Sequence, residues 1–300
     1  MKTNLLVLLT AMTLAACAKS GGNNSDQSAS LGTNSDSEII GGESVNPIDP
    51  IAKTVVAIFD TEQKSLCTGS ILSASLVVTA GHCFNADPTK LVLIFGTQLP
   101  SAAGPKPVVR RVVDGRVNPR YTQVNAVFEK NHKLDPDSIK EWGDISVLKF
   151  AGGLPPGFFA ARVLNISAAL KNGALVTLAG YGEINGPQHT PADRLRKVNV
   201  SISNAQFAPS EIQMDQRQGK GACHGDSGGP AYINIGGQNF LFGVTSRGSQ
   251  DKANDCSQFA IYTSILGQMK WLVAQTNALA AAKTKAKIET PTAAQATAQR

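Results

Sequence analysis

Short apolar runs separated by turn residues dominate the middle of the chain. They are rich in Val, Ile, Leu and Thr and are bounded by Gly, Pro, Asn, Asp or Ser, which is typical of β-strands. The predicted strands are 54–59, 70–79, 91–95, 108–113, 145–150, 174–179, 197–202, 231–235, 240–246 and 260–263. No helix of useful length is predicted between them, which excludes alternating β-α-β winding. Two antiparallel barrels or one large sandwich remain.

The one strong helical pattern lies near the C-terminus. Ile265, Met269 and Leu272 recur at helical spacing and predict a helix packed on the core. Residues 276–300 are mostly Ala, Lys and Thr, and we expect a solvated, frayed tail there. Contact of its lysines with an anionic surface is the alternative.

The first 38 residues are predicted to lie outside the fold. Lys2, a short apolar run and small residues predict an export signal over 1–16. Residues 17–38 are small and polar and predict a flexible tether. The segment before Cys17 resembles the lipobox of bacterial lipoproteins, which implies cleavage before Cys17 and a lipid on its sulfur. An ordinary signal with an incidental cysteine is the alternative.

Composition narrows the class of protein. The chain has 300 residues, of which 42% are hydrophobic and 17% charged, as in a packed globule. No internal run reaches the roughly 18–20 apolar residues of a membrane span. The net charge of +6 is too scattered to indicate nucleic-acid binding. There is no zinc finger, Walker loop or GxGxxG motif, and we expect no cofactor and no metal.

The cysteine count indicates disulfides. Cys17 is the odd one of five, which leaves Cys67, Cys83, Cys223 and Cys256. An even set in an exported chain predicts two disulfides.

The stretch from Gly225 to Pro230, Gly-Asp-Ser-Gly-Gly-Pro, indicates nucleophilic chemistry at Ser227. An activated serine must be exposed on a tight turn, and glycines beside it let main-chain N–H groups point at one spot. A serine hydroxyl also needs a base. Of four histidines, His82 directly follows an apolar strand and precedes Cys83, whereas His132 and His189 lie in polar loops.

The histidine needs a carboxylate to hold its tautomer. Asp144 heads an apolar strand, where a carboxylate requires a partner. With His, Asp and Ser in this order, the chain resembles the chymotrypsin-type serine endopeptidases, trypsin-like in the broad sense. The resemblance runs from Ile39 to about Gln275 and rests on 39–42, 79–83, 118–121, 144–150, 180–182, 225–230 and 246–248.

The resemblance implies an all-β fold of two packed antiparallel six-stranded barrels, 39–150 and 151–275, with a C-terminal helix. It implies that Ser227 is the nucleophile, His82 the base and then acid, and Asp144 its orienter. The N–H groups of Gly225 and Ser227 would form the oxyanion hole. The implied disulfides are Cys67–Cys83 and Cys223–Cys256.

The implied specificity pocket has Gly221 at its floor, with Ala222, Ser246, Gly248 and Ala260 around it. Without a carboxylate at the floor, an Arg or Lys side chain would be buried unpaired. We therefore expect the enzyme to prefer apolar residues before the cut. A minor preference for Glu, whose carboxylate His224 at the rim of the pocket would contact, is the alternative. Gly221→Asp should shift the preference toward basic residues.

Three positions depart from the family pattern, namely Gly143, Tyr181 and Arg247. The first two are expected to be tolerated. Arg247 lies where substrate residues upstream of the cut would rest. It would either attract acidic side chains or fold out into water.

The resemblance also implies activation by a cut between Glu38 and Ile39, whose freed amine would pair with Asp226. An activating protease that cuts after Glu38 is then a partner, besides protein or peptide substrates. We expect an exported precursor, outer-membrane, periplasmic or cell-surface, held by the Cys17 lipid and released on activation. A permanently active, tethered enzyme is the alternative to this zymogen.

Two other function classes remain to be weighed. A catalytically silent binding protein on the same fold would usually lack a triad residue, and all three are present. A lipid-anchored structural protein would leave His82, Asp144 and Ser227 without a role.

Overall fold

The computed structural model describes residues 39–102, 104, 106–131, 139–249 and 256–282. The predicted export signal, the tether with Cys17 and the tail beyond 282 lie outside these residues. Within the described chain, no helix is long and apolar enough to cross a membrane.

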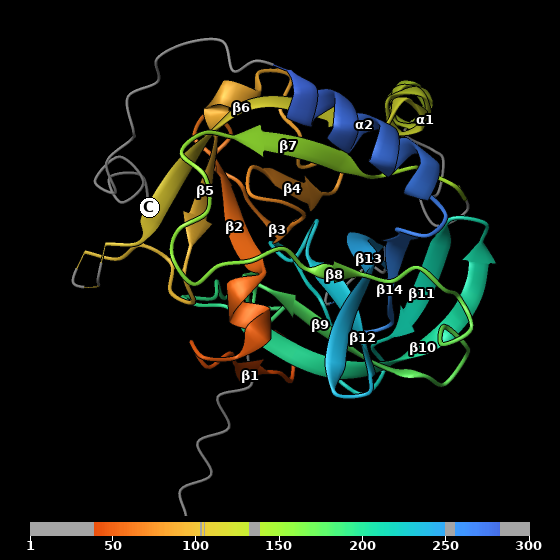
Figure 1. Ribbon diagram of the computed structural model, residues 1–300. Coiled ribbons are helices and arrows are strands. Elements are labelled where there is room, and N and C mark those ends of the chain that lie inside the picture. Colours follow the sequence, from red (N-terminus) through yellow and green to blue (C-terminus); the bar gives the residue numbers. More distant parts are fainter. Residues whose placement is uncertain (1–38, 103, 105, 132–138, 250–255, 283–300) are drawn as a thin grey trace, which may run out of the picture. The chain divides into compact units, whose positions relative to one another are not determined.

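The first half of the fold is a closed six-stranded barrel with antiparallel pairing throughout (Figure 1). Its strands pair in the order β2-β3-β4-β7-β6-β5, and β7 returns to lie against β4. The bounds are β2 (Val55–Asp60), β3 (Leu66–Ile71), β4 (Leu76–Thr79), β5 (Leu91–Phe95), β6 (Val108–Val117) and β7 (Ser146–Phe150). Short 3-10 helices span Pro50–Lys53 and Pro88–Lys90.

The second half forms another closed ring of six strands. Its order is β9-β10-β11-β14-β13-β12, and closure comes from β9, which pairs with both β10 and β12. The bounds are β9 (Leu175–Gly180), β10 (Arg196–Ala208), β11 (Glu211–Asp215), β12 (Pro230–Ile235), β13 (Gln238–Gly248) and β14 (Phe259–Ser264). The prediction of two six-stranded barrels is confirmed, and a single sandwich is excluded.

Burial on both faces explains why the strands of the first barrel read as continuous apolar runs. In β2, Val56 and Ile58 belong to one buried cluster with Leu93 and Phe95, whereas Val55 and Ala57 belong to another. The second cluster also contains residues of the other barrel and of the C-terminal helix. The strands therefore lack the polar–apolar alternation of a sheet with one wet face.

Three short strands escaped the sequence prediction. They are β1 (Glu43–Ser44), which pairs with β10, β8 (Arg162–Val163), which runs parallel to β13, and β11. The predicted strand 70–79 is in fact the end of β3, a turn and β4. The turn is closed by the Leu72 N–H, which donates to the Leu76 carbonyl over 2.8 Å.

The expectation that no useful helix precedes the C-terminus is wrong. Helix α1 spans Pro119–Lys130, with Asn118 as N-cap and Pro119 in its first turn. The Asn118 side chain accepts from the Arg120 N–H over 2.9 Å. Only Val124 of this helix is buried, so it lacks an apolar stripe. The Asn-Pro pair was the signal that could have revealed it.

The predicted C-terminal helix is confirmed, but the prediction of a solvated tail from residue 276 is wrong for 276–281, which are helical and include the buried Leu279. Helix α2 spans Met269–Ala281 and lies across β7 of the first barrel (Figure 1). The buried Lys149 ammonium of β7 donates to the carbonyl of Leu279 over 2.7 Å and to that of Ala282. A cation at the last carbonyls of a helix satisfies them and favours its dipole.

Candidate active site

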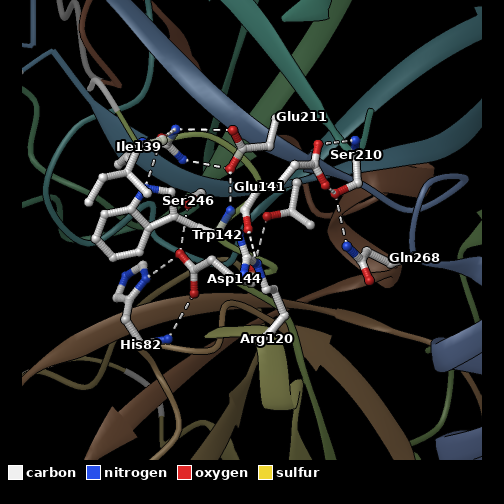
Figure 2. Close-up of polar contacts among 12 residues, drawn as sticks. His82, Arg120, Ile139, Glu141, Trp142, Asp144, Ser210, Glu211, Ser246 and Gln268 are labelled. Atoms are coloured by element: carbon white, nitrogen blue, oxygen red, sulfur yellow. Dashed lines mark hydrogen bonds and ion pairs between the residues drawn. The ribbon is translucent and has the colours of Figure 1, made fainter. Parts of the chain in front are cut away.

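His82 and Asp144 face one another between the ends of two paired strands (Figure 2). His82 follows β4, and Asp144 precedes β7. The His82 Nδ1 atom lies 2.8 Å from Asp144 Oδ2, and the His82 main-chain N–H donates to Oδ1 over 2.9 Å. The Ser246 hydroxyl of β13 donates to Oδ2 over 2.7 Å. The carboxylate thus has partners from both barrels.

This contact shifts the pKa values of both side chains. Burial favours the neutral form of Asp144, but His82, the Ser246 hydroxyl and the His82 N–H outweigh it, and the pKa of Asp144 is lowered. Desolvation lowers the pKa of His82, and the attraction and hydrogen bond of Asp144 overcome it, so its pKa is raised. The His82 side chain keeps 32% of its surface exposed, so it can be reached from solvent.

A buried ion pair supports the segment that carries Asp144. Arg247 donates to the two carboxylate oxygens of Glu211 over 2.9 and 3.1 Å, and to the Ile139 carbonyl over 3.0 Å. Glu211 also accepts from the Trp142 N–H over 3.0 Å. Only 9% of the Arg247 side chain and none of the Glu211 side chain is exposed. The Arg247 side chain is therefore not in solvent, and its charge is paired with Glu211 instead of being available to an acidic substrate residue. Both expectations for Arg247 are wrong.

The two other departures from the family pattern have structural explanations. Gly143 has a φ of +64°, a left-handed conformation that glycine adopts without strain. Tyr181 is buried and donates its hydroxyl to the Gly96 carbonyl over 2.6 Å.

The turn that carries Ser227 is fastened to the first barrel through Thr68 of β3. The Thr68 N–H donates to the Ser227 carbonyl over 2.8 Å, and the Thr68 hydroxyl donates to the Gly225 carbonyl over 3.0 Å. Cys67, next to Thr68, is disulfide-bonded to Cys83, which follows His82. A short covalent and hydrogen-bonded path therefore links Ser227 to His82.

Two peptide groups of this turn, 224–225 and 226–227, have fixed orientations. The His224 carbonyl accepts from the Glu183 N–H over 2.7 Å, and the Asp226 carbonyl accepts from the Gly229 N–H over 2.8 Å. Because a peptide unit is planar, these bonds also orient the N–H groups of Gly225 and Ser227. Within the described chain, neither N–H donates to a protein acceptor. Gly225 adopts a φ of +93°, which requires glycine.

Asp226 is a buried carboxylate without a cationic partner among the described residues. Its oxygens accept from the N–H groups of Gly182 over 2.8 Å and Cys223 over 2.9 Å. Burial nevertheless raises the pKa of Asp226 to about 7. Ile39 is buried in the core of the second barrel, and Ile40 forms a bridge with Gly221.

A cavity of about 210 Å³ opens beside Ser227. It is lined by Ala222, Cys223, His224, Ser227, Thr245, Ser246, Arg247, Gly248, Ser249, Cys256 and Ala260. Four of the five predicted pocket residues are among them, and none of the described lining residues is a carboxylate. The Cys223–Cys256 disulfide forms part of the wall. A larger cavity of about 490 Å³, around residues 41–43 and Asp49, contains no triad candidate.

Gly221, the predicted floor, does not line this cavity. It packs against Gln216, whose amide donates to the carbonyls of Ala222 over 3.1 Å and Cys256 over 2.6 Å and accepts from the Ala222 N–H over 2.7 Å. A side chain at position 221 would overlap the Gln216 amide. The sequence gives no local signal for this role of Gln216, nor for the roles of Thr68 and Glu211.

Comparison with known proteins agrees with this geometry. The family model described as Trypsin matches residues 39–272. A protein named "Chymotrypsin" from Phaedon cochleariae is 26% identical over 246 residues, covering 78% of this chain and 81% of that protein. "Trypsin alpha" from Drosophila erecta is 27% identical over 228 residues, covering 71% and 78%.

Proposed function

The chain belongs to the trypsin family of serine proteases, and we propose that it is an endopeptidase in which His82, Asp144 and Ser227 form the catalytic triad. The observation that carries this proposal is the contact of His82 with Asp144, 2.8 Å long, in a site where the Ser227 turn is tied to the same barrel through Thr68. A nucleophilic serine, a histidine base and a carboxylate that orients it are the parts that acyl transfer requires.

The reaction follows the established mechanism of the family. The Ser227 hydroxyl attacks the scissile carbonyl and loses its proton to the Nε2 atom of His82, while Nδ1 stays bound to Asp144. The N–H groups of Gly225 and Ser227 stabilise the oxyanion. His82 then gives the proton to the leaving amine, and water releases the acyl group from Ser227.

Casein hydrolysis by matched serine variants tests the assignment. Ser227→Ala should lower kcat/KM on the order of 10⁴-fold or more, since the nucleophile is lost. Ser167→Ala, at an exposed serine, should leave it unchanged. Equal melting temperatures would show that both variants fold, and undiminished hydrolysis by folded Ser227→Ala would overturn the proposal.

The pocket supports a preference for Leu, Met, Phe or Tyr before the cut. Ala222, Gly248 and Ala260 are small, and the described lining offers no carboxylate to an Arg or Lys side chain. A panel of chromogenic peptides tests this preference. Higher kcat/KM for Arg than for Leu and Phe would contradict it.

We further propose that the protein is made as a zymogen. Asp226 lies in the Ser227 turn and is buried without a cationic partner among the residues that the structure describes. A cut between Glu38 and Ile39 would create an α-amino group to pair with this carboxylate and stabilise the turn. Because the proposed pocket is apolar, another protease that cuts after Glu38 would activate it. A precursor as active as the protein beginning at Ile39 would contradict this proposal.

The proposed precursor is exported and attached to a membrane. Two disulfides are typical of exported proteins. The lipobox-like segment supports a lipid on Cys17 of the precursor, at an outer-membrane, periplasmic or cell-surface location. The activating cut would remove this lipid and release the enzyme. Fractionation with N-terminal sequencing tests the scheme, and an active membrane form that retains Cys17 would refute it.

A further inference from the structure

Three side chains of types that can bind a metal ion lie close together, and one of them, His224, lines the cavity beside Ser227. Glu183 and His189 belong to the loop between β9 and β10, and His224 lies just before the Ser227 turn. The Nδ1 atom of His189 lies 3.1 Å from Glu183 Oε2, and the rings of His189 and His224 are 5.6 Å apart. One ligand atom from each of the three residues lies within 4.8 Å of the other two.

The backbone holds these residues together. The Glu183 N–H donates to the His224 carbonyl over 2.7 Å. The Ile184 N–H donates to the Thr190 carbonyl over 2.9 Å and closes a small loop that returns His189 to Glu183. The two histidines are exposed and Glu183 is partly buried, so an ion from solvent can reach the cluster and the side chains can rotate toward it.

The charges around the cluster favour a cation. Within the described chain, the ion-pair partner of Glu183 is His189, and no Lys or Arg forms an ion pair with it. Two other groupings of Cys and His in the described chain are different, because their cysteines are oxidised to disulfides and offer no thiolate.

We propose that Glu183, His189 and His224 bind a divalent transition-metal ion, Zn²⁺ in the first place, and that the bound ion inhibits peptide hydrolysis. Two imidazoles and a carboxylate form a known zinc ligand set, and water would fill the fourth position. Ligand atoms of tetrahedral zinc lie about 3.3 Å apart. The His189–Glu183 pair already has this spacing, and rotation of the exposed His224 side chain closes the rest.

The inhibitory part rests on the proposed protease function. His224 lines the cavity together with Ser227, so an ion held by His224 would narrow the entrance to a substrate side chain. The His224 carbonyl, moreover, is part of the peptide unit that presents the Gly225 N–H. Metal binding therefore acts on substrate entry and on the oxyanion donors at once.

The binding test uses the Ser227→Ala full-length protein, which cannot digest itself. After chelator treatment, Zn²⁺ is titrated by calorimetry, and Co²⁺ by its visible absorption. We expect one site, with a Kd raised at least tenfold by His189→Gln and unchanged by His132→Gln, which removes a histidine outside the described residues. Equal affinity of the parent and His189→Gln, or equal weakening by His132→Gln, would overturn the site.

The inhibition test uses the activated wild-type enzyme. We expect Zn²⁺ to inhibit it, a chelator to restore activity, and His189→Gln to keep full activity but need at least tenfold more Zn²⁺. The same sensitivity in His189→Gln would place the inhibitory ion elsewhere, for example on His82, and would overturn the inhibition. Because the binding test needs no catalysis, failure of the protease assignment would not be mistaken for failure of the metal site.

Discussion

A carboxylate placed at position 221 should not by itself produce a preference for basic residues, because Gln216 occupies the space it needs. The Cβ of Gly221→Asp would overlap the Gln216 amide, which must then leave its site. Gln216 is fully buried and makes three hydrogen bonds to Ala222 and Cys256, two residues that line the cavity beside Ser227. The substitution therefore disturbs the wall of the cavity instead of adding a charge to it.

The expected cost follows from these three bonds. Each buried backbone group left without a partner costs about 1–3 kcal/mol, so Gly221→Asp should lose about 3 kcal/mol of unfolding free energy or more. Gln216→Ala loses the same three bonds and should cost about as much. Since both variants forfeit the same interactions, Gly221→Asp/Gln216→Ala should also lose about 3 kcal/mol, and the two changes should be coupled by a similar amount.

Urea unfolding in a Ser227→Ala background measures these free energies and prevents self-digestion. A chromogenic panel on the active enzymes gives the ratio of kcat/KM for Arg and Leu substrates. The ratio should rise clearly in the double variant only, where the new carboxylate has room. Additive costs, or a Gly221→Asp protein that is as stable as wild type and prefers Arg, would refute the role of Gln216.

Three further predictions concern ionisable side chains. Arg247→Ala leaves Glu211 buried without its cation and should lower the free energy of unfolding, measured in urea, by about 3–5 kcal/mol, whereas replacing both residues by Met and Leu should cost less. A loss below about 1 kcal/mol for Arg247→Ala would contradict the ion pair. Because the pKa of His82 is raised, kcat/KM should increase with pH as His82 loses its proton, with a midpoint above pH 6.5, and Asp144→Asn should move this midpoint to lower pH. An unchanged midpoint in Asp144→Asn would contradict the contact of His82 with Asp144. The free energy of unfolding of the uncut precursor, measured in urea, should fall by a few kcal/mol as pH rises from about 4 to about 7, because Asp226 keeps its proton to higher pH in the folded state than in the unfolded chain. Asp226→Asn should abolish this pH dependence.

The strands and the order of the candidate catalytic residues could be predicted because both depend on local sequence. The run 91–95 has the bounds of β5, since turn residues flank it on both sides. The pattern predicts one strand over 70–79 because the turn residues between β3 and β4 are small and interrupt the apolar run only weakly. Helix α1 was missed because it buries a single residue and has no apolar stripe.

Contacts between distant segments could not be predicted. Arg247 and Glu211 are 36 residues apart, and nothing in the sequence near either residue points to the other. The same holds for Gln216 and Cys256, which are 40 residues apart. These contacts depend on how β11, β13 and the loop after Asp215 close around the cavity. Local pattern alone therefore predicts a solvent-exposed or substrate-binding Arg247 and an open pocket floor at Gly221.

Labelling with a fluorophosphonate, followed by peptide mass mapping, tests most directly whether Ser227 is an activated nucleophile. We predict a single labelled serine, Ser227, in protein that begins at Ile39, and loss of labelling in His82→Ala at unchanged melting temperature. Labelling of another serine, or equal labelling of folded His82→Ala, would contradict the assignment.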